Sequence, residues 1–234
     1  MKILALVFVL LMFTPIAASS QYIWEAQNSG TSSEFRAMDF FDIDNGIVGG
    51  NNGVVLKTTD NGENWTSFTT LPQLNGVSNS NWVMGAYYKD INNVMLATRT
   101  GVVYTTTDGG TNWNQVYYSG VSGSGLSLEY NSGSGRIFVG RSNDVIYTDD
   151  FGLSWDSTNV SGLNFIEDFS FPNANQGYAV GSSGQIAVTT DGGVNWSSMG
   201  TVPGTSYLTG VHAFDFNNVI VIGLTGFIST TNDG

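Results

Sequence analysis

A motif that combines a hydroxyl, a carboxylate, a glycine and a tryptophan occurs four times in the chain. Its first copy consists of Thr58, Asp60, Gly62 and Trp65, and the other copies keep these residue types at the same spacing. An aspartate in such a place can accept backbone N–H groups of its own turn, while glycine supplies the positive φ that closes a hairpin. The motif therefore predicts a structural turn, and we assign none of its residues to catalysis. The four copies comprise Thr58, Asp60, Gly62, Trp65, Thr106, Asp108, Gly110, Trp113, Thr148, Asp150, Gly152, Trp155, Thr189, Asp191, Gly193 and Trp196.

The copies are the most regular part of a longer repeat. Their aspartates stand at positions 60, 108, 150 and 191, and an incomplete fifth copy at 230–234 has Asn232 in the corresponding place. A period of about 40 residues is that of four-stranded propeller blades. Short apolar segments separated by Gly/Asn turns precede each copy, as at 38–41, 47–49 and 54–56, and a strand follows each tryptophan. The repeat predicts an all-β fold, a β-propeller with about five blades visible.

The repeat resembles the Asp-box, or bacterial-neuraminidase repeat, family of β-propellers. The segments 50–65 and 181–196, in which a Gly-x-x-Gly turn precedes the motif, look most like the photosystem II stability/assembly factor type of propeller. The resemblance covers the whole chain after residue 20 and implies the fold. It does not imply one activity, because the same repeat occurs in hydrolases, sorting receptors and assembly factors. The photosynthetic role is therefore not carried over to this chain.

The composition excludes several classes of site. The formal net charge is −12, with 7 Lys and Arg against 19 Asp and Glu, so the surface repels phosphate backbones and nucleic acid is not an expected partner. The chain has no cysteine, which excludes disulfides, thiolate zinc sites and cysteine nucleophiles. Its one histidine, His212, is expected in the core or between blades. We therefore expect no metal and no cofactor.

The first twenty residues have the pattern of a secretory signal peptide. Met1 and Lys2 form a positive start, an apolar run follows at 3–13, and small residues lead to Ser20. The apolar run is too short to span a bilayer, so no transmembrane helix is expected. The predicted organisation is a signal peptide at 1–20 and an Asp-box propeller at 21–234. Export to the periplasm, the cell surface or the extracellular space follows.

Trp24 aligns with the tryptophans that follow the Asp turns. This leaves two arrangements open. In the favoured one the chain is a C-terminally truncated part of a larger ring. In the other, residues 22–28 close a five-bladed ring by pairing with a strand near 227–229.

The binding residues are expected on the face opposite the Asp turns. Arg99 and Arg141 fall in corresponding turns of neighbouring blades, where they could anchor a carboxylate or simply be solvated. Tyr117 and Tyr118, at the start of a connection over 117–125, are expected as exposed aromatic contacts for a protein or a glycan.

A catalytic site is not evident in the sequence. The sialidase resemblance would imply an arginine triad, but only four arginines exist, and Ala37 and Met38 follow Arg36 where an Arg-Ile-Pro lead-in would stand. Outside the turns Glu129, Glu167 and Asp168 are the acids available, and no facing pair is apparent. The leading hypothesis is a secreted, non-catalytic scaffold for a protein or glycan partner. The alternative is a glycoside hydrolase of the sialidase-like or xyloglucan-hydrolysing type.

Overall fold

The structure is a computed structural model that describes residues 25–71, 82–118, 127–142 and 144–234. The predicted signal peptide, Trp24 and most of the predicted connection at 117–125 lie outside these residues. No helix of the described ranges is long and apolar enough to cross a membrane.

The described residues form five antiparallel sheets in chain order, four of four strands and a last one of three, which we call blades 1 to 5. This confirms the all-β class and the predicted strand order within each repeat. Short 3₁₀ turns, η1 (Asn51–Gly53) and η2 (Leu224–Gly226), lie in blades 1 and 5. Blade 1 consists of β1 (Phe35–Phe40), β2 (Gly46–Gly50), β3 (Val54–Thr58) and β4 (Thr66–Thr70); blade 2 of β5 (Val83–Tyr88), β6 (Val94–Thr98), β7 (Val102–Thr106) and β8 (Asn114–Tyr118); blade 3 of β9 (Ser127–Asn131), β10 (Arg136–Gly140), β11 (Asp144–Thr148) and β12 (Asp156–Asn159); blade 4 of β13 (Ile166–Ser170), β14 (Gly177–Gly181), β15 (Gln185–Thr189) and β16 (Ser197–Thr201); and blade 5 of β17 (Leu208–Ala213), β18 (Val219–Gly223) and β19 (Phe227–Thr231).

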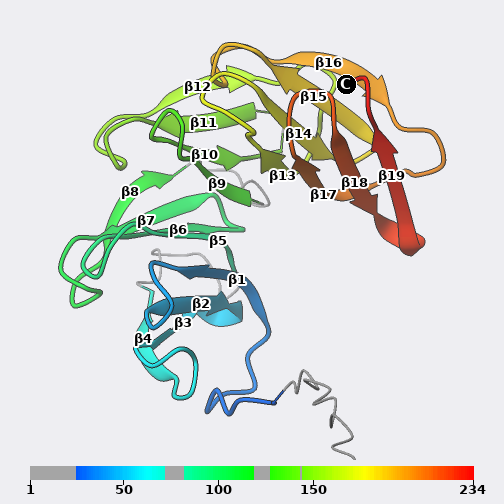
Figure 1. The fold of residues 1–234 in the computed structure, drawn as a ribbon. Helices are drawn as coiled ribbons and strands as arrows, with labels where there is room; N and C mark the ends of the chain where they lie inside the picture. Colours follow the sequence, from blue (N-terminus) through cyan, green and yellow to red (C-terminus); the bar gives the residue numbers. More distant parts are fainter. Residues whose placement is uncertain (1–24, 72–81, 119–126, 143) are drawn as a thin grey trace, which may run out of the picture.

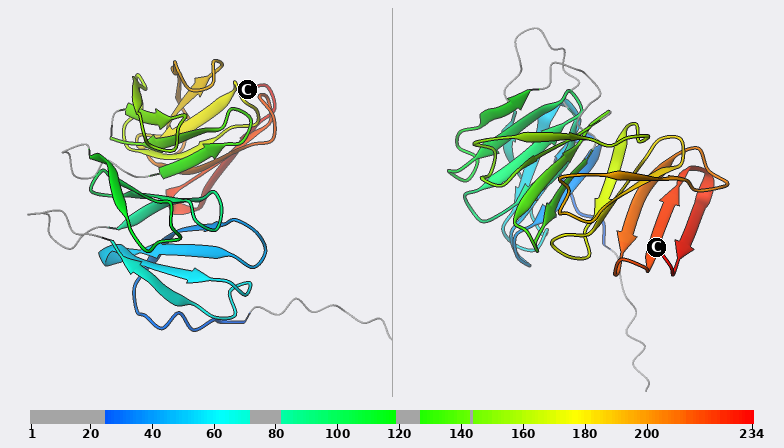
Figure 2. Two further views of the ribbon diagram at one scale, coloured as in Figure 1. Left: turned by 90° about the vertical axis from the view of Figure 1, so that its left-hand side faces the viewer. Right: turned by 90° about the horizontal axis from the view of Figure 1, so that it is seen from above.

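The blades fan out along an arc, with the first strand of each blade innermost (Figure 1). Successive inner strands lie against one another, from β1 through β5, β9 and β13 to β17. Two further views show the same open arc (Figure 2). Residues 25–28, the described part of the predicted closing segment, form no strand, and β19 pairs only with β18 among the described residues. The structure therefore contradicts a ring closed at five blades.

Each blade has the burial pattern that its strand order demands. Central strands are covered on both faces, so every residue of β6 and β14 is buried. The outer strands face solvent, and all five residues of β16 are exposed. Apolar β-branched and aromatic residues fill the central strands, whereas Ser, Thr and Asn dominate the outer ones.

The core lies between blades rather than within one blade. Trp113 of blade 2 packs edge-to-face on Phe68 of blade 1, with ring centroids 5.8 Å apart. Trp196 of blade 4 joins a buried cluster that includes Phe138 of blade 3. A Cβ at Gly85 in β5 would collide with Leu128 of β9, so the close approach of two inner strands requires glycine there.

The two ends of the blades gather different turns, as predicted. The Asp turns bond to the turns between first and second strands, for example from Gly109 N to the Asn92 carbonyl at 3.0 Å. We call this end the Asp-box face. At the other end, the loop face, Arg99 N donates to the Trp82 carbonyl at 2.9 Å.

Two predictions for blade 5 are wrong. Pairing of Val219 with Thr231 shifts the last Asp turn by one residue, so that Thr231 Oγ1 bonds Asp233 Oδ1 at 2.7 Å, and Asp233 rather than Asn232 occupies the aspartate position. His212 is exposed instead of packed. The His212 ring is exposed because no sixth sheet covers β17 within the described ranges. It lies edge-on to the Phe214 ring, with ring centroids 4.6 Å apart.

Candidate functional site

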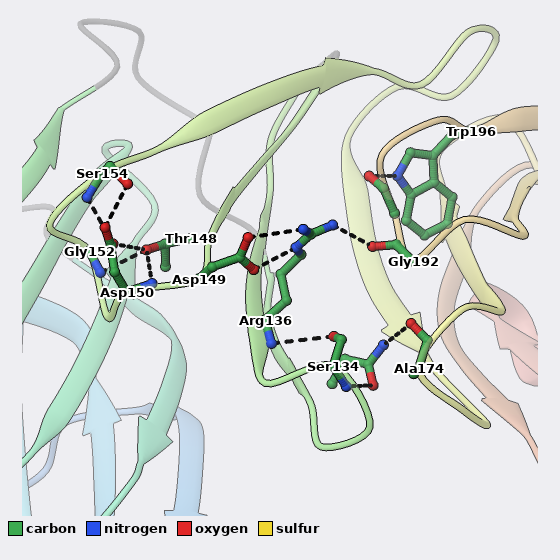
Figure 3. Close-up of polar contacts among 12 residues, drawn as sticks. Ser134, Arg136, Thr148, Asp149, Asp150, Gly152, Ser154, Ala174, Gly192 and Trp196 are labelled. Atoms are coloured by element: carbon green, nitrogen blue, oxygen red, sulfur yellow. Dashed lines mark hydrogen bonds and ion pairs between the residues drawn. The ribbon is translucent and has the colours of Figure 1, made fainter.

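The Asp turns use their polar groups internally. In blade 3, Thr148 Oγ1 donates to Asp150 Oδ1 at 2.8 Å and accepts Gly152 N at 2.8 Å, while Asp150 also accepts the amide and hydroxyl of Ser154 (Figure 3). The other three complete copies repeat this pattern with Asn in place of Ser154. These bonds lower the pKa of Asp150 to about 2, the Ser154 hydroxyl contributing most. The aspartates are thus ionised turn acceptors, a poor state for acid–base chemistry near neutral pH.

Arg136 connects two Asp turns on the same face. Its guanidinium binds both oxygens of Asp149, at 2.8 and 3.0 Å, and donates to the Gly192 carbonyl of blade 4 at 2.8 Å (Figure 3). It also lies 4.3 Å above the ring of Tyr147. Since each guanidinium nitrogen donates to a neighbouring group, Arg136 holds blades together rather than presenting charge to a ligand.

Two of the predicted binding residues lie together in an internal contact. Arg141 binds Asp144 through Nε at 2.7 Å and donates from Nη1 to the Tyr117 hydroxyl at 2.5 Å. Only 17% of the Arg141 side chain is exposed. Tyr117 lies within β8 and packs on Trp155 at 5.5 Å, so its prediction as an exposed loop aromatic is wrong. A ligand could reach the Arg141 guanidinium only by breaking these contacts.

The other two predicted residues are accessible but separate. Tyr118 ends β8 and is 46% exposed. Arg99 is exposed in the turn between β6 and β7, and its guanidinium carbon lies 5.8 Å from the centroid of the Trp82 ring. The structure therefore does not pair Arg99 with Arg141.

Arg99 instead shares Trp82 with a second arginine. The Arg36 guanidinium carbon lies 4.9 Å from the same ring centroid. Trp82 is half-buried just before β5, and the Arg36 side chain is 50% exposed, with a long contact of 3.7 Å to Glu34. Two cations on one aromatic ring give a positive, accessible patch on an otherwise acidic protein. We call Arg36, Trp82 and Arg99 the Trp82 cluster.

Bulges in two inner strands place Arg36 and Glu167 at the loop-face ends of these strands. The pairing of β1 skips Arg36, and that of β13 skips Glu167, so each is a bulge residue at the loop-face end of its strand. The Tyr207 hydroxyl donates to Glu167 Oε1 at 2.5 Å. Burial raises the pKa of Glu167, while this bond and the positive charge of Arg99 oppose the rise. Arg99 therefore acts electrostatically on blade 4 from its place on blade 2.

The remaining carboxylates along the inner strands mostly bond backbone. Asp39 Oδ2 accepts Tyr88 N of the next inner strand at 2.6 Å, and Asp168 Oδ2 accepts Val211 N at 2.9 Å. Burial raises the pKa of both aspartates against these bonds. A glycoside hydrolase needs two carboxyl groups free to face a glycosidic bond. Asp39 and Asp168 are partly committed to holding adjacent inner strands together.

Sequence reasoning missed Arg36 and Trp82. Trp82 follows a long connection rather than an Asp turn, so the repeat gave no reason to single it out. The sequence gives Arg36 a role only as a member of a hypothetical arginine triad. The sequence does show a basic residue, Arg36, at the start of an inner strand. It does not show the bulge that displaces Arg36, because no residue pattern marks that bulge.

The fold and its turns define the chain as a β-propeller built from Asp-box blades. The model of the family described as photosynthesis system II assembly factor YCF48 matches residues 19–144, more than half of the 234 residues. The chain belongs to this family. No curated protein matches it.

Two solved structures with TM-scores above 0.6 share the fold. A GH74 enzyme from Niastella koreensis is 16% identical with a TM-score of 0.65, over 82% of this chain and 35% of its own. A catalytically inactive virginiamycin B lyase from Staphylococcus aureus, with quinupristin, is 13% identical with a TM-score of 0.68, over 89% and 73%. YCF48 bound to D1 peptide is 15% identical with a TM-score of 0.42, over 92% and 98%. This chain spans about a third of the length of the GH74 enzymes, with 35% and 29% in two of them. Likeness at such identity shows the fold and not the activity.

Proposed function

We propose that this chain is an exported, non-catalytic β-propeller that binds a protein partner through the Trp82 cluster. One observation carries the proposal: Arg36 and Arg99 both lie against the half-buried Trp82 ring on the loop face. No ion pair joins Arg99 to an acid among the described residues. Its guanidinium can therefore donate to an incoming acceptor at little cost.

The chemistry of this cluster favours a single carboxylate. Guanidinium groups bind carboxylates through two parallel hydrogen bonds, and the Trp82 ring can pack on the chain that carries the carboxylate. A polyanion is a poor ligand because the net charge of −12 repels it at long range. The C-terminal carboxylate of a protein chain fits these conditions.

Family membership supports a protein partner over a glycan. The family is named for YCF48, an assembly factor, and assembly factors act on other proteins. From the family we take only the class of partner, a protein, and not photosystem II itself. Export rests on the signal-peptide pattern of residues 1–20.

The proposal is tested with a fluorescent peptide that is neutral apart from a free C-terminal carboxylate. We expect anisotropy to show binding by the mature protein, and no binding of the same peptide when its C-terminus is amidated. Arg99→Gln should weaken binding at least about tenfold, the effect of losing a charge-assisted hydrogen bond. Lys89→Gln, which removes one positive charge near the Asp-box face, is the matched control and should bind like wild type.

Two outcomes would overturn the proposal. One is equal binding of the free and amidated peptides, or unchanged binding by Arg99→Gln. The other is release of reducing sugar from xyloglucan by the wild-type protein, which would establish the hydrolase alternative. An Arg141→Ala variant separates the two arginines: it should lose stability and keep peptide affinity, because Arg141 is bonded internally.

A further inference from the structure

A hollow on the inner side of the arc combines aromatic walls with carboxylates. Its volume is about 370 Å³, and it is lined by β1, β5 and β9. The lining includes Met38, Asp39, Phe40, Tyr87, Glu129 and Tyr130. We call it the inner-strand hollow. It uses none of the residues of the Trp82 cluster, so the inference drawn from it is independent of the proposed function.

The aromatic wall is preformed. Tyr87 and Tyr130 stack with ring centroids 4.4 Å apart and an interplanar angle of 20°. Both rings also line an adjoining cavity of about 290 Å³, which adds Phe151 and Lys89. There the Lys89 ammonium lies 5.2 Å from the Phe151 ring centroid, so a ring beside this aromatic wall already contacts an ammonium group of the chain.

Glu129 is the acid of the hollow whose bonding capacity is unused. Asp39 accepts two backbone N–H groups, from Phe40 and Tyr88. Glu129, by contrast, has no hydrogen-bond or ion-pair partner among the described residues, although it is mostly buried. A buried carboxyl without a partner is costly, and a cationic partner would relieve that cost.

The surroundings of Glu129 are negative on several sides. Burial, followed by the negative charges of Asp168 on β13 and Asp39 on β1, raises the pKa of Glu129 to about 7. The phenol rings of Tyr87 on β5 and Tyr130 on β9 also line the hollow. The nearest positive group of the lining residues, Lys89, belongs to the adjoining cavity. The electrostatic complement of the hollow is therefore a cation.

From this combination we infer that the inner-strand hollow binds an alkylammonium group, its charge on Glu129 and its alkyl chain on the stacked Tyr87 and Tyr130. The faces of aromatic rings attract cations, and a carboxylate accepts charge-assisted hydrogen bonds from an ammonium group. No set of three or more acidic or histidine side chains in the described ranges is arranged to hold a metal ion. A lysine side chain of a protein and a free primary amine offer the same chemistry.

Ligand-observed NMR with butylammonium chloride tests the inference. Pentanol serves as the neutral analogue of similar size, and sodium chloride matches the ionic strength. We expect saturable binding of butylammonium and none of pentanol. Affinity should rise between pH 6 and pH 8, because Glu129 becomes ionised over this range while the amine stays charged.

Glu129→Gln should weaken butylammonium binding at least about tenfold and abolish the pH dependence, because it keeps the shape and removes the charge. Glu63→Gln removes the same negative charge from an exposed residue of an Asp turn, and this variant should bind butylammonium like wild type. A thermal unfolding curve for each variant confirms that it is folded. A short peptide with one lysine distinguishes the two sources: binding of the peptide alone assigns a protein ligand, and binding of butylammonium alone assigns a small amine.

The inference is wrong if pentanol binds as well as butylammonium, if neither ammonium probe binds, or if folded Glu129→Gln keeps wild-type affinity. It is also wrong if calcium chloride displaces butylammonium at equimolar concentration, which would indicate a metal site.

Discussion

Arg136 in blade 3 donates a hydrogen bond of 2.8 Å to the carbonyl of Gly192, at the tip of the Asp turn of blade 4. The Asp turn of blade 4 thereby accepts a hydrogen bond from the neighbouring blade 3. Asn131 makes a similar link to the Asn173 and Ala174 carbonyls, at 3.3 and 3.2 Å. Turns on the Asp-box face therefore hold blades 3 and 4 together.

Arg136→Gln should destabilise the fold by about 1–3 kcal/mol, because it removes the hydrogen bonds of a mostly buried guanidinium to the exposed Asp149 and leaves the Gly192 carbonyl without its donor. Urea unfolding measures the loss. Arg36→Gln, at an exposed arginine with a long ion pair, is the control and should change stability by less than about 0.5 kcal/mol. Equal stability of the two variants would show that Arg136 does not join the blades.

Thr148→Val should cost about 1–3 kcal/mol. Thr148 is 2% exposed, and its hydroxyl is the acceptor for the Gly152 amide, which valine cannot replace. The exposed Thr66→Val is the matched control, and thermal unfolding of both variants is the measurement. If Thr148→Val and Thr66→Val have equal unfolding midpoints, the Thr148 hydroxyl does not stabilise the turn.

Asp150→Ala should lower the unfolding midpoint and leave peptide binding intact. The folded state holds the pKa of Asp150 at about 2, below the ordinary 3.8, so its stabilisation is present above about pH 4. That stabilisation is lost as pH falls toward 2. Wild type and variant should therefore converge in unfolding midpoint at about pH 2. Lost binding at an unchanged midpoint would reassign Asp150 to function.

Glu129→Gln should make stability less dependent on pH between 4.5 and 7. The pKa of Glu129 is about 7 in the folded protein and 4.5 in a free side chain, so the folded state binds more protons in this interval. Wild-type stability then falls as pH rises, by up to about 3 kcal/mol from this group. Chemical unfolding at several pH values checks the slope. An identical slope in the variant would mean that Glu129 is better solvated than its burial indicates.

The repeat made most of the fold predictable, because turn chemistry and strand alternation are local. Asp60, Asp108, Asp150 and Asp191 each mark the turn before an outer strand, and each such turn is found. The prediction for the last turn is wrong by one residue because Asn232 and Asp233 fit the motif almost equally in sequence. Only the pairing of Val219 with Thr231 decides between them.

The candidate site was less predictable, because it depends on contacts between blades. Arg99 and Arg141 occupy corresponding turns, but Asp144 and Tyr117 bind one of them and leave the other exposed. The meeting of Arg36 with Trp82 requires a bulge in β1 and the approach of blade 1 to blade 2. Neither is encoded in a single segment.

The central claim is that a carboxylate binds at the Trp82 cluster, and the indole N–H signals of the six tryptophans test it most directly. The mature protein, labelled with ¹⁵N, is titrated with the neutral peptide bearing a free C-terminal carboxylate, and a Trp82→Phe variant assigns the Trp82 signal. We predict that the Trp82 signal moves and saturates with the free peptide and stays fixed with the amidated one. Saturable binding that shifts another tryptophan and leaves Trp82 unmoved would contradict the account.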